Sequence, residues 1–244
     1  MTTDQKIMLI ASVGTCLSAF ATFWTVREIK KQRETIYLPE LALSSTLFEC
    51  ESSSGGLLPS WTKTIKTSEG IINCLGSEQP DIRYSIPIRN VGLGVAKNVI
   101  VSWEFPIVHL VTELNELAQN SSSSAKFNIK NDLFSMTDNT GNMVCCVWKT
   151  QKNNFVDYIL PSSVQQTPIM LDIPLAYLYV SSAYVFLSMK SGKFEQIHVP
   201  KCEVTFKYKD IGDQKHETKY EISLSPAAFS NEKIMGSFEA RNLS

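Results

Sequence analysis

The first hydrophobic feature of the chain is an uninterrupted apolar run near its amino terminus. The residues from Ile7 to Val26 include no charged side chain, and Lys6 and Arg27 flank them. A helix of this length measures about 30 Å, which is the thickness of a hydrocarbon core. A buried helix of similar length in a soluble domain would show a polar face, and the apolar core of a cleaved signal peptide is shorter. The pattern therefore predicts an uncleaved transmembrane helix over residues 7–26.

Beyond residue 36 the apolar positions alternate with polar ones, which is the period of β-strands. Alternation predicts strands at 37–43, 83–89, 97–105, 202–208 and 218–224, and short apolar runs predict two more at 144–148 and 157–160. The last two alternating segments flank residues 210–217, DIGDQKHE, which predicts a hairpin. Short strands with antiparallel connections are typical of a β-sandwich.

Two segments follow a helical pattern instead. Residues 109–118 place Leu110, Leu114 and Leu117 on one helix face. Residues 174–189 are almost wholly apolar but are too short for a standard span, and Asp172 lies just upstream. We expect a buried helix, or a helix followed by a strand, that covers the β-sandwich, and a second membrane segment is the alternative.

Charge gives the predicted span an orientation. Four basic residues follow it closely, at Arg27, Lys30, Lys31 and Arg33, whereas only Lys6 precedes it. Basic residues beside a span stay on the cytoplasmic side and can contact anionic lipid headgroups. We therefore expect a single-pass membrane protein with its carboxyl-terminal part in the cytoplasm; in a bacterium the membrane would be the inner one. The whole chain has 23 basic and 24 acidic residues, which argues against a broad nucleic-acid surface.

The predicted fold class is mainly β, with an N-terminal transmembrane helix followed by an immunoglobulin-like antiparallel β-sandwich with one or two inserted helices. The expected boundaries are a short periplasmic N-terminus at 1–6, the transmembrane helix at 7–26, a basic juxtamembrane segment at 27–36, a cytoplasmic β-sandwich domain at 37–225 and a polar tail at 226–244.

Small residues recur along the predicted span at three- and four-residue spacing. They are Ala11, Gly14, Thr15, Ser18, Ala21, Thr22 and Thr25. A stripe of small residues lets two helices approach closely in lipid, so it indicates self-association through the span. The alternative is that the stripe reflects only the ordinary abundance of small residues in membrane helices.

Candidate chemistry is sparse in this sequence. His109, His198 and His216 lie in separate contexts without ligands at metal-site spacing, and we expect His216 to face solvent in a hairpin loop. Gly92 and Gly94 precede a predicted strand rather than a helix, so they indicate a turn with positive φ and not a dinucleotide loop. We predict no catalytic, cofactor-binding or metal-binding residues, no cofactor and no enzymatic activity.

Two short motifs carry a resemblance to a known family. Asn90, Gly92, Ala96, Asn98 and Val99 form a strand–turn–strand pattern, and residues 208–215 resemble the closing hairpin of the same kind of domain. With the apolar run and the KKQRE stretch, the chain resembles small bacterial membrane-anchored proteins of anti-phage defence loci, and most nearly the transmembrane effectors of retrons.

The resemblance implies a role in abortive infection. A retron reverse transcriptase and its RNA–DNA product would hold the effector inactive, and the released effector would perturb the inner membrane. The expected partners are thus the lipid bilayer, further copies of the chain, and the reverse transcriptase with its nucleic-acid product. The alternative function is a non-toxic membrane-anchored β-sandwich that serves as an interaction or scaffold module.

Overall fold

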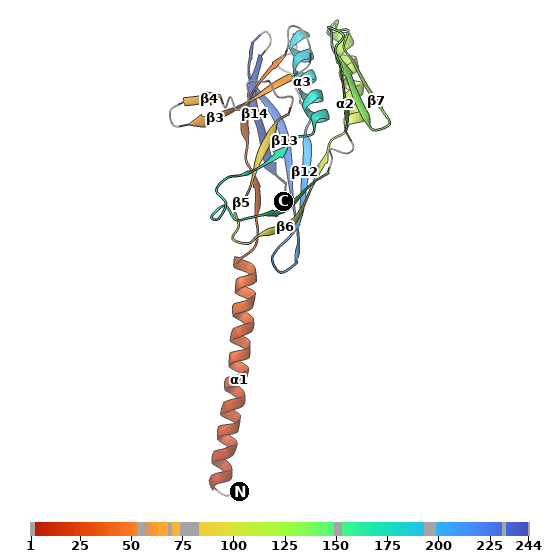
Figure 1. Cartoon of the computed structure of the whole chain (residues 1–244). Coiled ribbons are helices and arrows are strands. Elements are labelled where there is room, and N and C mark those ends of the chain that lie inside the picture. Colours follow the sequence, from red (N-terminus) through yellow and green to blue (C-terminus); the bar gives the residue numbers. More distant parts are fainter. Residues whose placement is uncertain are drawn as a thin grey trace.

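The computed structural model describes residues 3–52, 57, 59–67, 70–73, 83–148, 153–192, 199–230 and 233–243. One long helix, α1 (Thr3–Ile36), projects away from a mainly β body (Figure 1). The apolar run and the basic segment that follows it therefore form one continuous helix of 34 residues. The predicted mainly β class is confirmed for the body.

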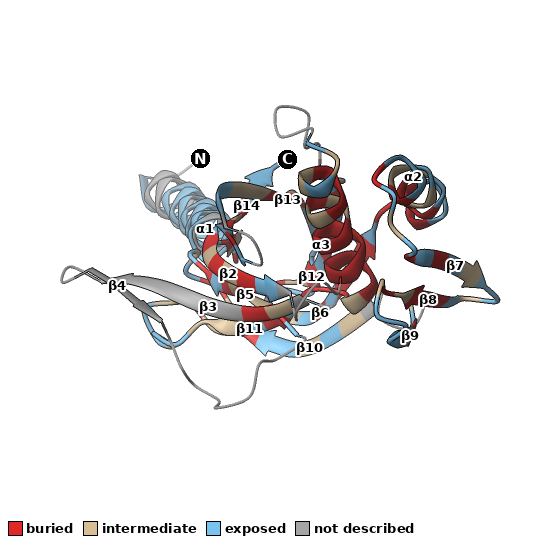
Figure 2. Ribbon diagram, turned by 90° about the horizontal axis from the view of Figure 1, so that it is seen from above, coloured by how far each residue is buried: buried red, intermediate tan, exposed pale blue. Residues whose placement is uncertain are grey.

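The largest sheet within the described residues has eight antiparallel strands. They are β2 (Thr46–Ser52), β3 (Pro59–Thr67), β4 (Gly70–Asn73), β6 (Ala96–Glu104), β10 (Asn153–Ile159), β12 (Cys202–Lys209), β13 (Lys215–Ser230) and β14 (Lys233–Asn242). Their spatial order is β10-β6-β12-β13-β14-β2-β3-β4. Immunoglobulin-type sandwiches divide their strands between two facing sheets, whereas these eight strands form one curled sheet (Figure 2).

Two three-stranded sheets complete the body. The first contains β1 (Leu41–Leu43), β5 (Ser85–Asn90) and β11 (Ile169–Asp172), with β5 in the middle. The second contains β7 (Lys126–Lys130), β8 (Leu133–Thr137) and β9 (Met143–Val147), with β8 in the middle. Of the strand predicted at 37–43, only residues 41–43 form a strand, β1. Residues 37–40 connect α1 to β1.

The apolar segment at 174–189 is a buried helix, as predicted. It forms α3 (Leu175–Lys190), which packs against the curled sheet (Figure 2). Tyr177 is fully buried there, and its hydroxyl donates to the carbonyl oxygens of Pro200 at 2.7 Å and Ile222 at 3.3 Å. The second predicted helix is α2 (Ile107–Asn120), which buries Leu110 and Leu114. Because α3 is buried in the body, its hydrophobicity is accounted for without a membrane.

The carboxyl terminus differs most from its prediction. Residues 226–244 were expected to form a polar tail, but β13 continues to Ser230 and β14 lies between β13 and β2. Ile234 and Phe238 of β14 are buried in the core. The reason is the two-residue period of a strand, which turns the polar residues Ser237 and Glu239 to the other face while alternate positions enter the core.

Candidate functional site

The strongest candidate for a functional surface is the exposed side of α1. Val13, Leu17, Phe20 and Trp24 recur every three or four residues and so share one helix face. Their side chains are 50% to 66% exposed, and the helix stands clear of the body (Figure 1). An apolar face of this size is unfavourable in water. Transfer of each large side chain from water to an apolar environment would lower the free energy by about 1.5–3 kcal/mol. The face therefore requires an apolar partner.

Three hydroxyl groups on α1 form hydrogen bonds within the helix. Ser12, Thr22 and Thr25 each donate to the carbonyl oxygen four residues earlier, at 2.9 Å. A hydrogen bond of this kind, from a hydroxyl to the helix backbone, satisfies the hydroxyl donor without water. These polar side chains are therefore compatible with an apolar environment.

The opposite face of α1 holds most of the predicted helix-packing residues. Gly14, Thr15, Ser18 and Thr22 border a shallow depression along the helix, together with Ala19 and Phe23. A Cβ atom added at Gly14 would meet nothing within 4 Å. Ala21 and Thr25 continue this face by their spacing, and the side chain of Ala11 lies outside the described residues. The helix thus has a bulky face and a flat face.

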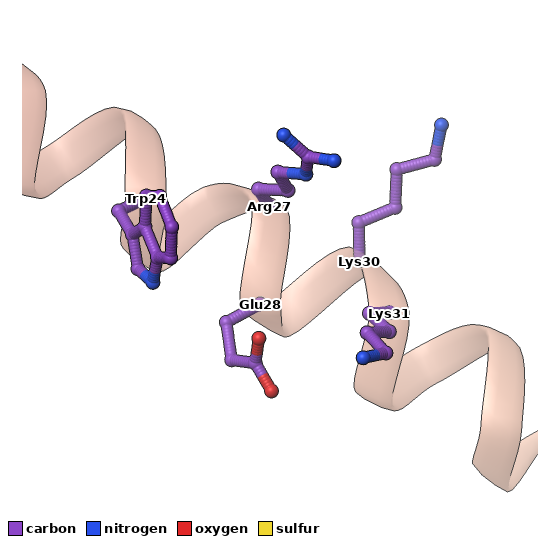
Figure 3. Close-up of a pocket in the computed structure, with 5 residues that line it drawn as sticks. All are labelled: Trp24, Arg27, Glu28, Lys30 and Lys31. Carbon is purple, nitrogen blue, oxygen red and sulfur yellow. The ribbon is translucent and has the colours of Figure 1, made fainter.

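Basic side chains follow directly after the bulky face. Arg27, Lys30 and Lys31 are exposed beyond Trp24, and Figure 3 shows Arg27 and Lys30 extending to one side while Glu28 points to the other. The side chain of Arg33 lies outside the described residues. An indole followed by cations is the arrangement found where a helix passes from lipid to water. Within the described residues, no helix is both long and apolar enough to cross a membrane.

The connection between α1 and the body is a dense hydrogen-bonded joint around Asn90. This side chain is 1% exposed. Its amide nitrogen donates to the carbonyl oxygens of Gly94 at 2.6 Å and Ile159 at 3.1 Å, and its amide oxygen accepts from the backbone N–H groups of Glu40 and Gly92. One buried amide therefore binds the segment after α1 to the β5–β6 turn and to the end of β10.

Gly92 and Gly94 serve this joint by close approach, and the prediction that they adopt positive φ is wrong. The glycines with positive φ in the described residues are Gly141 and Gly192. A Cβ atom at Gly94 would lie within 2 Å of the carbonyl oxygen of Tyr37, and one at Gly92 would lie 2.3 Å from that of Leu38. The missing side chains leave room for the backbone that leaves α1.

Two tyrosines hold the same segment from the main sheet. The hydroxyl of Tyr220 donates to the carbonyl oxygen of Leu41 at 2.9 Å, and that of Tyr208 donates to the carbonyl oxygen of Pro39 at 3.4 Å. Burial raises the pKa of Tyr220, so the phenol keeps its proton and acts as a donor. The joint thus combines contacts from β5, β12 and β13.

The hairpin beside the joint contains a contact that sequence reasoning missed. His216 was expected to face solvent, but its ring stacks on Tyr208 and its Nε2 lies 2.9 Å from a carboxylate oxygen of Asp210. Burial raises the pKa of Asp210, but hydrogen bonds from His216 and from the N–H groups of Gln214 and Gly212 outweigh burial and hold this pKa below its ordinary value. The contact between these two side chains helps to fix the shape of the β12–β13 turn.

A first prediction concerns the close approach at the joint. Replacing Gly94 by alanine is expected to destabilise the body by about 1–3 kcal/mol, because the new methyl group must displace backbone atoms. For a protein of this size the melting temperature should fall by roughly 3–10 °C. Thermal unfolding of the full chain in detergent, followed by circular dichroism, measures the change.

The matched control is Gly212→Ala. Its Cβ would meet only the side-chain oxygen of Asp210, at 3.3 Å, so a shift below about 2 °C is expected. Equal melting temperatures for the Gly94 variant and the wild type would show that the segment after α1 is not held tightly by the body.

Neither metal-ligating side chains nor similarity to known proteins points to a further site in the described residues. Among the residues that the structure describes, no three His, Cys, Asp or Glu side chains gather where they could hold a metal ion. His198 and Cys74 lie outside those residues. No family model, curated protein or solved structure gave a significant match to this chain.

Proposed function

We propose that this protein is a membrane-anchored effector of a bacterial anti-phage defence system of the retron type, which perturbs the inner membrane when it is released from inhibition. The observation that carries the anchoring is the exposed apolar face of α1, which continues directly into Trp24 and the exposed cations Arg27, Lys30 and Lys31. The effector role rests on the resemblance carried by Asn90–Val99 and by residues 208–215.

The length of the apolar run supports a span rather than a surface contact. Twenty residues from Ile7 to Val26 reach across about 30 Å of hydrocarbon. The run extends beyond the described side chains, since those of residues 7 and 9–11 are outside them. The back-bonded hydroxyls of Ser12, Thr22 and Thr25 support the same proposal, because their hydrogen bonds persist in lipid.

The basic residues at the end of the run support a cytoplasmic body. The exposed side chains of Arg27, Lys30 and Lys31 lie within about 8 Å of helix beyond Val26, where the positive-inside rule operates. With this orientation the β body faces the reverse transcriptase and the RNA–DNA product that would inhibit it.

Membrane perturbation by a protein with one span requires several copies. The flat face of α1 around Gly14 and Ser18 supports their association, because small residues let backbones approach and gain van der Waals contacts in lipid. The bulky face around Leu17 and Phe20 would then face lipid chains.

A second candidate function is a non-toxic anchored interaction or scaffold module. The observation that favours it lies on the main sheet, where Phe155 of the edge strand β10 stands opposite Ile100 of β6. Both side chains are exposed, which is typical of a surface that binds another protein. A module of this kind would need the anchor but no membrane damage.

One experiment separates the two functions. The full chain, fused at its carboxyl end to a fluorescent protein, is expressed in a bacterial host without the inhibitor, and a voltage-sensitive dye reports the membrane potential. We expect a fluorescent membrane ring, which requires a cytoplasmic carboxyl end, together with depolarisation. Gly14→Leu with Ser18→Leu should reduce depolarisation at equal membrane levels, since weakening association by about 1 kcal/mol lowers its constant roughly fivefold.

The control pair, Val13→Leu with Leu17→Ile, makes apolar substitutions on the other face of α1 and should depolarise like the wild type. Depolarisation that is equal in all three proteins would remove the flat face from the mechanism. A membrane ring without depolarisation by the wild type would favour the scaffold module.

A further inference from the structure

Two exposed apolar side chains occupy the tips of neighbouring turns of the body. Leu93 lies in the β5–β6 turn and is 55% exposed, and Ile211 lies in the β12–β13 turn and is 69% exposed. Tight turns ordinarily carry Gly, Asn, Asp or Ser, because these residues adopt turn conformations easily or form hydrogen bonds with their own backbone. The two positions therefore call for an apolar or interfacial partner.

Both turns lie beside the carboxyl-terminal part of α1. Leu93, Ile211 and Lys30 border one cavity of about 450 Å³, together with Tyr37. Figure 1 shows the β12–β13 hairpin reaching toward the end of α1 on the side of the body that faces the helix. The tips of both turns therefore lie beside α1 at the level of Lys30.

The level of Lys30 coincides with lipid headgroups if α1 is anchored. Lys30 follows Val26, the last residue of the apolar run, by about 6 Å of helix. The headgroup layer extends about 5–7 Å beyond the hydrocarbon core on each side. With α1 along the membrane normal, a turn beside Lys30 lies within this layer.

Charge on the same hairpin fits an anionic surface. Lys209 and Lys215 stand directly opposite each other on the last rung of the β12–β13 ladder. Like charges at such positions repel each other, and an anion beside them would relieve this repulsion. The acidic residues of the turn are engaged within the protein, since Asp213 pairs with Lys97 at 3.1 Å and the Asp210 carboxylate forms hydrogen bonds with His216 and Gln214. The hairpin therefore presents lysines around an apolar tip.

The turns are also held in shape before any contact is made. The Asp210 carboxylate accepts from the N–H of Gln214 at 2.9 Å, and the side chain of Asn90 holds the other turn through Gly92 and Gly94. A preformed tip loses little conformational entropy on insertion.

We propose that the Leu93 and Ile211 tips form a second membrane contact, in which they insert among anionic lipid headgroups while Lys209 and Lys215 neutralise phosphate charge. The proposal rests on the anchoring of α1 and deepens it. The single helix alone would let the body rotate and tilt, whereas this contact sets the orientation of the body against the bilayer.

The test uses the full chain in vesicles of phosphatidylcholine with about 30% phosphatidylglycerol, or of phosphatidylcholine alone. Cys16, Cys74 and Cys145 are replaced by serine, and an environment-sensitive fluorophore is attached through Ile211→Cys. Lipids with a quencher near the headgroup report contact. Leu133→Cys, in the sheet of β7, β8 and β9 that lies away from α1, serves as the matched site (Figure 1). A separate sample keeps Cys16 as its labelled site within the apolar run.

We expect the fluorophore at 211 to be quenched at least about twofold more than the one at 133 in anionic vesicles, with a smaller difference in neutral ones. Lys209→Glu with Lys215→Glu should reduce the quenching at 211, while Lys126→Glu with Lys130→Glu, the same charge change on β7, should leave it unchanged.

Three results would overturn the proposal, and they are distinguishable. Quenching at 16 without quenching at 211 would leave the anchor and remove the second contact. An absence of quenching at both sites would remove the anchor together with the contact. A spectral shift at 211 that grows with protein concentration but is insensitive to lipid quenchers would show that the tips bind a second copy of the chain instead.

Discussion

Arginine at both Leu17 and Phe20 is expected to move the protein from the membrane fraction to the soluble fraction. Each arginine at the centre of a span costs about 2.5–3.5 kcal/mol on insertion, so the pair should disfavour insertion on the order of a thousandfold or more. The two side chains are 66% and 63% exposed and belong to the part of α1 that stands clear of the body (Figure 1). The substitutions should therefore leave the body folded.

The measurement is the distribution of the full chain between membrane pellet and supernatant after an alkaline wash. Leu17→Ile with Phe20→Leu keeps both positions apolar and should remain in the pellet. A wild type that is extracted by the wash, or an arginine variant that resists it as firmly as the wild type, would contradict anchoring by α1.

Removal of residues 226–244 is expected to abolish the cooperative fold. These residues include β14, which pairs with β13 on one side and β2 on the other, so their loss separates β2, β3 and β4 from the rest of the main sheet. The ring of Phe238 also lies 5.0 Å from that of Phe48 and 5.5 Å from that of Trp61. Loss of this one side chain would lower the free energy of unfolding by about 3–5 kcal/mol. The whole free energy of unfolding of a typical domain is only about 5–15 kcal/mol.

Thermal unfolding and near-ultraviolet circular dichroism of the truncated chain measure the loss. The control ends at residue 242, which keeps the whole of β14 and should unfold like the wild type. If the chain shortened to residue 225 retained a cooperative transition, β14 would be dispensable and its place within the sheet would be refuted.

Much of the local structure could be predicted from short-range periodicity. The alternation at 97–105 corresponds to β6, the segment at 202–208 to β12, and the spacing of Leu110 and Leu114 to α2. These elements are readable because one face of each is buried, and burial selects apolar side chains at the period of the element.

The residues of the joint could not be predicted in the same way. Asn90 and Gly92 belong to a motif that was visible in the sequence, but its polar and small residues were assigned to an isolated turn. Their contacts come from residues far along the chain, since Asn90 binds Ile159 and Tyr220 binds Leu41. A glycine required for close approach has the same local pattern as one required for positive φ, so only the neighbouring backbone distinguishes them.

By itself the sequence determined the apolar run of α1, the basic residues after it and the alternation of most strands, because these properties depend on the order of side chains along one element. Only the tertiary structure decided that residues 226–244 form strands within the main sheet, that α3 packs in the body rather than forming a second membrane segment, and that the turns bearing Leu93 and Ile211 lie beside Lys30. Strand pairing and the meeting of distant turns depend on which surfaces bury one another, and that free energy belongs to pairs of segments rather than to either segment alone.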